Sequence, residues 1–207
     1  RMHEHIMHFS NRQFYGENLL AAENVKHRLL SNDEHDHLLN NAVTYIDTAG
    51  CGYTEKVNPE SLSISNEEEA VLLLKHLKLV LHQYNPLEKR RKEISIGIIS
   101  PYKEQVQLIE DLIDNNDDLQ NSPIRIVVKT VDGFQGQERD IIYISLVRSN
   151  DSKEIGFLND IRRMNVALTR AKSKLVVIGD SSTLANHPFY KSFIDYIEEI
   201  QAYVSAW

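Results

Sequence analysis

Apolar residues follow two patterns along most of the 207-residue chain. One pattern is a short continuous run of strand length, and the other places an apolar residue at every third or fourth position, as on one helix face. Strand-like runs occupy residues 43–47, 94–99, 124–128, 140–147 and 174–178. Continuous apolar strands that alternate with helices are typical of a parallel sheet covered on both faces. The pattern therefore predicts an α/β fold with a mainly parallel sheet.

The predicted helices fill the intervals between these strands. Residues 65–68, Ser-Asn-Glu-Glu, match a capping box that starts a helix. Pro101 is expected at the first position of the next helix, where proline is favoured. The spacing of apolar residues predicts two further helices, over residues 158–171 and 189–204. We expect a loop over residues 115–122.

One domain of ordinary size accommodates this pattern. We expect an N-terminal helix-and-loop segment at residues 1–42, in which Ile6, Phe9 and Phe14 share the inner face of a short helix. Residues 43–207 would then form the α/β core. The chain begins on an arginine, which favours a piece of a larger protein.

Composition narrows the class of protein. A net charge of −7 argues against a grip on nucleic acid by the whole surface, but a local basic groove would suffice. A single cysteine, Cys51, excludes an internal disulfide and favours a reducing, cytoplasmic compartment. We expect no membrane span and no signal peptide. The acidic run 67–69 and the basic run 89–92 are interpreted as solvated surface.

Residues 130–138, Thr-Val-Asp-Gly-Phe-Gln-Gly-Gln-Glu, carry candidate chemistry. Two glycines permit a tight loop with exposed N–H groups, and the Thr130 hydroxyl could donate to a phosphate oxygen. Gln135 and Glu138 present side chains beyond the loop, and an acidic side chain can hold a ribose hydroxyl. The alternative is a plain connection between strands with a surface glutamate.

Residues 158–171 form the second candidate segment. Arg163 and Arg170 are seven residues apart, hence two turns apart on one face of the predicted helix. An arginine forks onto phosphate oxygens and stabilises charge on a transferring phosphoryl group. For Arg163, a structural ion pair with Asp132 is as good an explanation as a contact with phosphate. For Arg170 we favour the contact with phosphate.

These two segments resemble motifs V and VI of superfamily 1 helicases, in the branch that includes the nonsense-mediated-decay RNA helicase. The likeness to motif VI extends upstream through Gly-Phe-Leu-Asn-Asp-Ile-Arg-Arg at 156–163, and residues 98–105 resemble motif IV. Arg1-Met2-His3 resembles the start of the second RecA-like lobe, although Glu4 stands where that family usually has proline. The resemblance spans nearly the whole chain and is weakest over residues 20–65.

The resemblance implies a RecA-like three-layer fold that supplies one side of an ATP site. Arg1 and Arg170 would reach the γ-phosphate, Glu138 would contact the ribose, and Gly136 and Gln135 would lie at the edge of the nucleotide. The chain contains no Gly-x-x-x-x-Gly-Lys-Ser/Thr phosphate loop. The phosphate loop and the Mg²⁺-binding acid would then belong to a first lobe, and this chain alone would hold neither ATP nor Mg²⁺ and would be inactive.

The resemblance also implies a single strand of nucleic acid as partner, with RNA and DNA both open. Thr130 and Ser100 would contact its backbone. Both follow predicted strands, and in parallel sheets ligands sit at the carboxyl ends of strands. The alternative function is a non-catalytic domain of RecA-like shape that binds nucleic acid or a protein.

Two further features are given plain structural interpretations. His3, His5 and His8 lack a carboxylate or cysteine partner, so we interpret them as exposed or packing residues and predict no metal site. Asp180 follows an apolar strand, as Mg²⁺-binding acids do, but without a phosphate loop we expect it to cap a helix.

Overall fold

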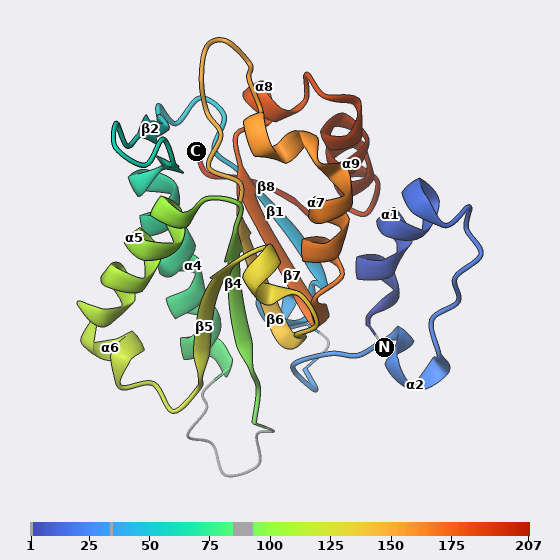
Figure 1. Cartoon of the computed structure of the whole chain (residues 1–207). Coiled ribbons are helices and arrows are strands. Elements are labelled where there is room, and N and C mark those ends of the chain that lie inside the picture. Colours follow the sequence, from blue (N-terminus) through green and yellow to red (C-terminus); the bar gives the residue numbers. More distant parts are fainter. Residues whose placement is uncertain (1, 34, 85–92) are drawn as a thin grey trace.

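The computed structural model describes residues 2–33, 35–84 and 93–207. Within them a six-stranded sheet has the order β5-β4-β6-β7-β1-β8, and every neighbouring pair is parallel (Figure 1). The strands are β1 (Val43–Asp47), β4 (Ile96–Ser100), β5 (Ile126–Thr130), β6 (Arg139–Ser145), β7 (Ala171–Gly179) and β8 (Tyr203–Ser205). A small antiparallel hairpin joins β2 (Lys56–Val57) to β3 (Ile64–Ser65). The predicted parallel sheet is confirmed.

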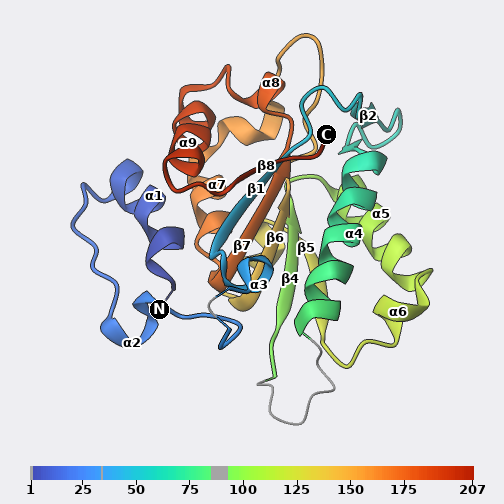
Figure 2. The same ribbon diagram turned by 180° about the vertical axis from the view of Figure 1, so that it is seen from behind.

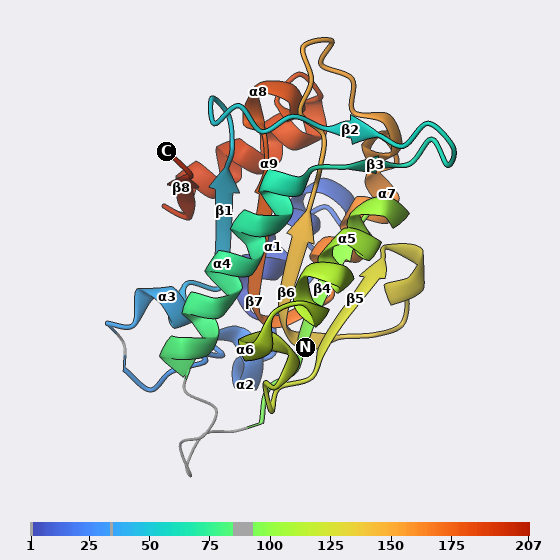
Figure 3. The ribbon, with the colours of Figure 1, turned by 90° about the vertical axis from the view of Figure 1, so that its left-hand side faces the viewer.

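Helices cover both faces of the sheet, which gives the three layers of a RecA-like fold (Figures 1 and 2). One face carries α3 (His37–Asn40), α4 (Glu67–Tyr84), α5 (Lys103–Asp114) and α6 (Asp117–Gln120). The other face carries α1 (Glu4–Phe14), α7 (Ile161–Leu168) and α9 (Pro188–Glu199). Shorter turns are α2 (Glu23–Lys26), α8 (Ser181–Leu184), η1 (Asp132–Phe134) and η2 (Gly156–Asn159). Figure 3 shows the β2–β3 hairpin lying across the carboxyl ends of the strands.

The strands are apolar throughout because each contributes to two cores. Successive side chains of a strand point to opposite faces. Ile98 therefore packs with the α4 and α5 side, whereas Ile99 packs with the α1, α7 and α9 side, and both are fully buried. In α1, Ile6 and Phe9 are buried and Phe14 packs against them, as predicted. No helix among the described residues is long and apolar enough to cross a bilayer.

Several predicted helix boundaries are wrong by one or more residues. The Oδ1 of Asn66 accepts from Glu69 N at 3.1 Å, so Asn66 is the N-cap and α4 begins at Glu67, one residue later than a cap at Ser65 predicts. Pro101 lies outside α5, which starts at Lys103. The predicted loop 115–122 contains α6, capped by the preceding asparagine.

The predicted arginine helix is wrong at its end, because α7 stops at Leu168. The Thr169 hydroxyl donates to the carbonyls of Asn165 and Val166, which closes the last turn. Arg139 N then donates to Arg170 O, and strand pairing with β6 begins. Arg163 and Arg170 therefore do not share a helix face. Pairing within the sheet likewise turns the predicted end of the last helix into β8.

The plain interpretations of Asp180 and of the N-terminal histidines as capping, packing or exposed residues are confirmed. Asp180 caps α8 by accepting from Ser182 N at 2.8 Å. His3 is buried, and its ring packs edge-on against His5, which is exposed like His8. The basic run 89–92 lies outside the described residues.

A substitution at Gly97 on β4 tests how tightly motif V packs on the sheet. A Cβ at this position would lie 2.4 Å from Cζ of Phe134, which is fully buried in η1. We expect Gly97→Ala to lower the free energy of unfolding by about 1–3 kcal/mol through overpacking. Urea unfolding monitored by circular dichroism measures the change. Phe134→Leu removes the clashing ring atom, so the double variant should lose less than the sum of the two single variants; strict additivity would contradict this packing.

Candidate nucleotide and nucleic-acid site

The predicted site residues lie at two opposite edges of the sheet. Ser100 and Thr130 end the paired strands β4 and β5 at the carboxyl edge and are register partners. Glu138 and Arg170 precede β6 and β7 and therefore lie at the amino edge. The expectation that Ser100 and Thr130 lie at the carboxyl ends of strands is confirmed, whereas Glu138 and Arg170 lie at the opposite edge. Residues 131–138 return along one face of the sheet and connect the two edges (Figure 1).

Backbone pairing brings Glu138 and Arg170 together at the amino edge. Arg139 N donates to Arg170 O at 3.1 Å, and Arg139 is the register partner of Ala171. The half-buried Arg170 side chain is held locally, because its Nε donates to Val166 O at 2.9 Å. A carboxylate and a guanidinium therefore emerge from adjacent strands, as a site for a ribose and a phosphate requires.

Gln135 and Gly136 are both exposed on the returning loop. Gly136 has φ of +78°, in the left-handed region that favours glycine, and no atom lies within 4 Å of a Cβ placed there. Gln135 borders a groove of about 360 Å³ whose opposite wall is α7, with Arg162 and Val166. The loop thus leaves its backbone open to a ligand along the face of α7.

Arg163 has the structural role that its alternative interpretation described. Its Nε lies 3.4 Å from Asp132 Oδ1 and 3.4 Å from Asp160 Oδ2. Asp160 also caps α7 by accepting from Arg163 N at 3.2 Å. All three side chains are about half exposed, so the ion pairs add little to stability. Their effect is to join motif V to motif VI across the groove.

Arg1 lies outside the described residues, so its predicted role is not tested. His3 N donates to Lys172 O at 2.9 Å, which ties the start of α1 to the first residues of β7. Glu4, where the helicase family usually has proline, is the first residue of α1 and suits the positive end of the helix dipole.

The two candidate nucleic-acid residues differ in accessibility. Thr130 is partly exposed, and its Oγ1 accepts from Gly133 N at 3.3 Å. Ser100 is fully buried, and its Oγ accepts from Tyr102 N at 3.4 Å. In this conformation the Thr130 hydroxyl is open to a ligand and the Ser100 hydroxyl is covered. The predicted contacts of both with nucleic acid stay predictions.

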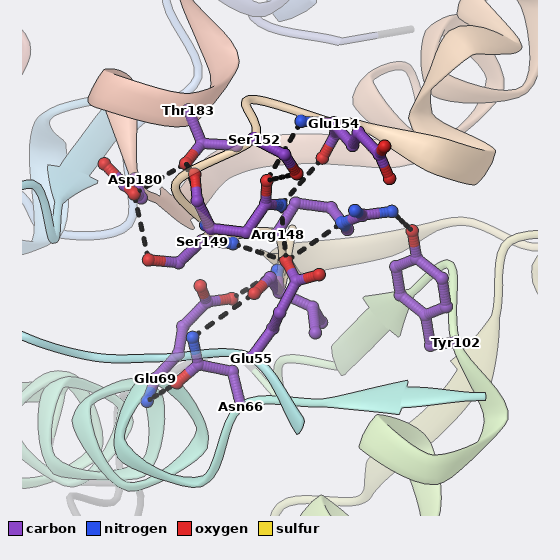
Figure 4. Close-up of polar contacts among 12 residues, drawn as sticks. Glu55, Asn66, Glu69, Tyr102, Arg148, Ser149, Ser152, Glu154, Asp180 and Thr183 are labelled. Atoms are coloured by element: carbon purple, nitrogen blue, oxygen red, sulfur yellow. Dashed lines mark hydrogen bonds and ion pairs between the residues drawn. The ribbon is translucent and has the colours of Figure 1, made fainter. Parts of the chain in front are cut away.

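A buried polar network at the carboxyl edge was missed from the sequence (Figure 4). Its centre is Val147, a fully buried residue with φ of +69°, which is rare for a β-branched side chain. Val147 N donates to Glu69 Oε1 at 2.9 Å, and Val147 O accepts from Asn66 Nδ2 at 3.2 Å. Glu69 is therefore buried, which corrects its interpretation as solvated surface.

Arg148, the residue after this turn, is buried in the same network. Its Nε donates to Glu55 Oε2 at 2.9 Å, and its Nη1 lies 3.5 Å from the Tyr102 hydroxyl. Glu55 also accepts from Ser149 N at 2.8 Å and from Asn150 Nδ2 at 2.9 Å. The sequence offered one signal, the three successive polar residues 148–150 directly after a buried strand. Nothing local marked Glu55 as their partner, or Glu69 as the partner of Val147.

Burial controls the charge of Glu69. Removal from water raises its pKa from 4.5 to about 7, although the Ser145 hydroxyl and Val147 N both donate to it and oppose the change. Its second oxygen, Oε2, has no hydrogen-bond partner among the described residues. A buried carboxyl with one unpaired oxygen therefore takes up a proton near neutral pH.

We expect Glu69 to make the domain less stable as pH rises. The unfolded chain releases this proton near pH 4.5 and the folded chain near pH 7, so the free energy of unfolding falls between those values. Relative to Glu69→Gln, which cannot ionise, the wild-type domain should lose roughly 3 kcal/mol from pH 4.5 to pH 8. Chemical denaturation at several pH values measures the difference between the two proteins. A difference that stays constant with pH would show that Glu69 does not titrate in this way.

Comparisons with known proteins place the chain among helicases. Residues 1–182 match the family model described as AAA domain. Over 96% of its length the chain is 38% identical to the DNA polymerase alpha-associated DNA helicase A of Schizosaccharomyces pombe and 34% identical to the DNA-binding protein SMUBP-2 of Rattus norvegicus. It is 35% identical, over 97% of its length, to an uncharacterized ATP-dependent helicase of Methanocaldococcus jannaschii.

The chain spans only 19% to 30% of the length of these relatives. Within that span the similarity includes all three segments that resemble helicase motifs IV, V and VI, because nearly the whole chain is matched. The chain therefore belongs to the AAA domain family and is a superfamily 1 helicase domain of the branch that includes the nonsense-mediated-decay RNA helicase.

Proposed function

We propose that this domain is the second RecA-like lobe of an ATP-dependent helicase and that it lends Arg170 to an ATP site shared with a first lobe. The observation that carries the proposal is the hydrogen bond from Arg139 N to Arg170 O, which sets Glu138 and Arg170 side by side at the amino edge. A carboxylate beside a guanidinium suits one side of a nucleotide whose phosphates are bound by the phosphate loop of another lobe. Arg1 is proposed for the same role as Arg170 on the resemblance alone.

The described residues fit one side of ATP. Glu138 offers an acceptor for the ribose, Gly136 and Gln135 offer an open loop, and Arg170 offers a guanidinium to the γ-phosphate. The chain contains no phosphate loop, so the phosphate cradle and the carboxylate that holds Mg²⁺ are assigned to the first lobe. Hydrolysis of ATP supplies the energy for movement, while this lobe contributes charge stabilisation and, through the Asp132–Arg163 contact, a link to the carboxyl edge.

Single-stranded nucleic acid is the proposed partner at the carboxyl edge. Thr130 would donate to a phosphate of the strand. The buried Ser100 would act indirectly, because its hydroxyl accepts from Tyr102 N and fixes the protein backbone there. Such contacts grip a strand without reading its sequence. The names of two relatives refer to DNA, which supports a nucleic-acid partner, and both DNA and RNA are compatible with backbone contacts. A cytoplasmic location follows as part of the same proposal.

In the complete enzyme, Arg170→Ala should lower ATP turnover at least a hundredfold and leave nucleotide binding nearly intact. The reason is that a guanidinium on the γ-phosphate acts mainly in the transition state. Steady-state ATPase rates and the binding of a fluorescent ATP analogue separate the two effects. Arg125→Ala is the matched control, because Arg125 is exposed and lies at the same amino edge just before β5, with β4 and β6 between it and β7, which Arg170 precedes.

Unaltered turnover in Arg170→Ala would remove Arg170 from the catalytic role. It would also favour the alternative of a non-catalytic binding domain. Because Arg170 donates to Val166 O, thermal unfolding of each variant is measured alongside, and a rate is compared only between proteins that are folded at the assay temperature.

The 207-residue chain by itself should show no measurable Mg²⁺-ATPase, with or without single-stranded nucleic acid. It has the arginine side of the site and lacks a phosphate loop. A coupled ATPase assay on the purified domain, with the complete enzyme as positive control, makes the measurement. Robust turnover by the domain alone would contradict the shared-site proposal.

A further inference from the structure

Phe157 is an exposed aromatic residue at the carboxyl edge that the proposed function leaves unused. It retains 64% of its accessible surface, while its neighbours Ile155 and Leu158 are buried at 6% and 2%. These two anchors hold η2 against the core, and the Leu158 carbonyl accepts from the Tyr190 hydroxyl at 2.8 Å. The turn therefore presents the phenyl ring outward from a fixed base.

The ring is positioned by the same network that surrounds Arg148. Gly156 has φ of +52°, and a Cβ there would lie 2.2 Å from Arg148 Nη1 and 3.1 Å from the Tyr102 hydroxyl. The backbone of η2 therefore rests directly on this pair. Phe157 packs edge-on against Tyr102, with ring centroids 5.8 Å apart and an interplanar angle of 75°. This T-shaped contact with the buried Tyr102 supports the Phe157 ring, most of which remains exposed.

The surroundings of the ring suit a nucleobase. Phe157 and Pro101 border a pocket of about 40 Å³, together with Thr130 and Arg163. That volume holds about one water molecule, so a base cannot enter it and must lie across its rim. The rim is apolar where it is formed by Phe157 and Pro101 and polar where it is formed by Thr130.

Charge near this rim favours a nucleic-acid backbone on one side. Lys129 directly precedes Thr130 in sequence, Lys103 is two residues after Pro101, and both lysines are exposed. Asp132 and Asp160 line the pocket and both contact Arg163, which offsets their charge. A strand would therefore pass with its phosphates towards the lysines and with one base over Phe157.

We propose that Phe157 stacks on a base of the bound single strand and so extends the nucleic-acid site beyond the Thr130 hydroxyl. The proposal rests on the proposed function, since it assumes that a single strand crosses the carboxyl edge. Stacking on an aromatic side chain is tolerant of sequence, as backbone contacts are, because every base has a flat face.

The test uses the complete helicase without nucleotide and a single-stranded oligonucleotide that carries 2-aminopurine among thymines, or among uracils in an RNA version. We expect Phe157→Ala to weaken binding about tenfold and to reduce the quenching of 2-aminopurine, since stacking contributes roughly 1–3 kcal/mol per base. Phe157→Trp should restore both. The dependence of binding on salt should be unchanged, because no phosphate contact is lost.

The matched control is Leu79→Ala, which removes an apolar side chain of 59% exposure from α4, on the other face of the sheet. Binding of Phe157→Ala within twofold of the wild type would overturn the platform, and so would a failure of Phe157→Trp to restore affinity or an equal loss in Leu79→Ala. The proposed function is tested separately by the turnover of Arg170→Ala. That variant can lose hydrolysis while Phe157→Ala binds normally, so the two failures are distinguishable.

Discussion

The left-handed turn at Val147 is the constraint on which the carboxyl edge of this domain depends. A buried β-branched residue with φ of +69° costs on the order of 1–3 kcal/mol and persists only where its surroundings fix it. Here Glu69 and Asn66, at the start of α4, bind its N–H and carbonyl. The turn directs Arg148 into the interior, where Glu55 pairs with it, and the backbone at Gly156 packs against its guanidinium.

The candidate nucleotide residues and the candidate nucleic-acid residues lie at opposite edges of the sheet, so any coupling between them must cross the domain. Glu138 and Arg170 lie at the amino edge, whereas Thr130 lies at the carboxyl edge. Motif V and α7 both run between these edges on the same face of the sheet, and the Asp132–Arg163 contact joins them near Thr130, towards the carboxyl edge. A nucleotide and a strand would therefore touch different ends of the same two segments, which is a physical route for coupling ATP hydrolysis to movement.

Periodicity predicted the sheet and most helices because apolar strands and helix faces are local signals, as at Ile98 and Ile99. It failed where distant pairing decides the outcome. Arg170 leaves α7 because its carbonyl pairs with β6, which helical spacing cannot indicate. Glu69 stands in an acidic run typical of surface, yet its partners Ser145 and Val147 are more than seventy residues away in sequence and bury it. Such networks depend on the assembled fold, so local sequence did not reveal this part of the site.

An acidic domain can hold nucleic acid if part of the binding energy does not come from charge. The chain carries a net charge of −7, and the acidic groups beside Thr130, Asp132 and Asp160, both contact Arg163. In the proposed function, stacking on Phe157 and a hydroxyl contact from Thr130 release few counterions, so these two contacts would depend only weakly on salt. A grip of short range and little sequence preference can be broken and remade at each step, which suits the movement along a strand that we propose for the complete enzyme.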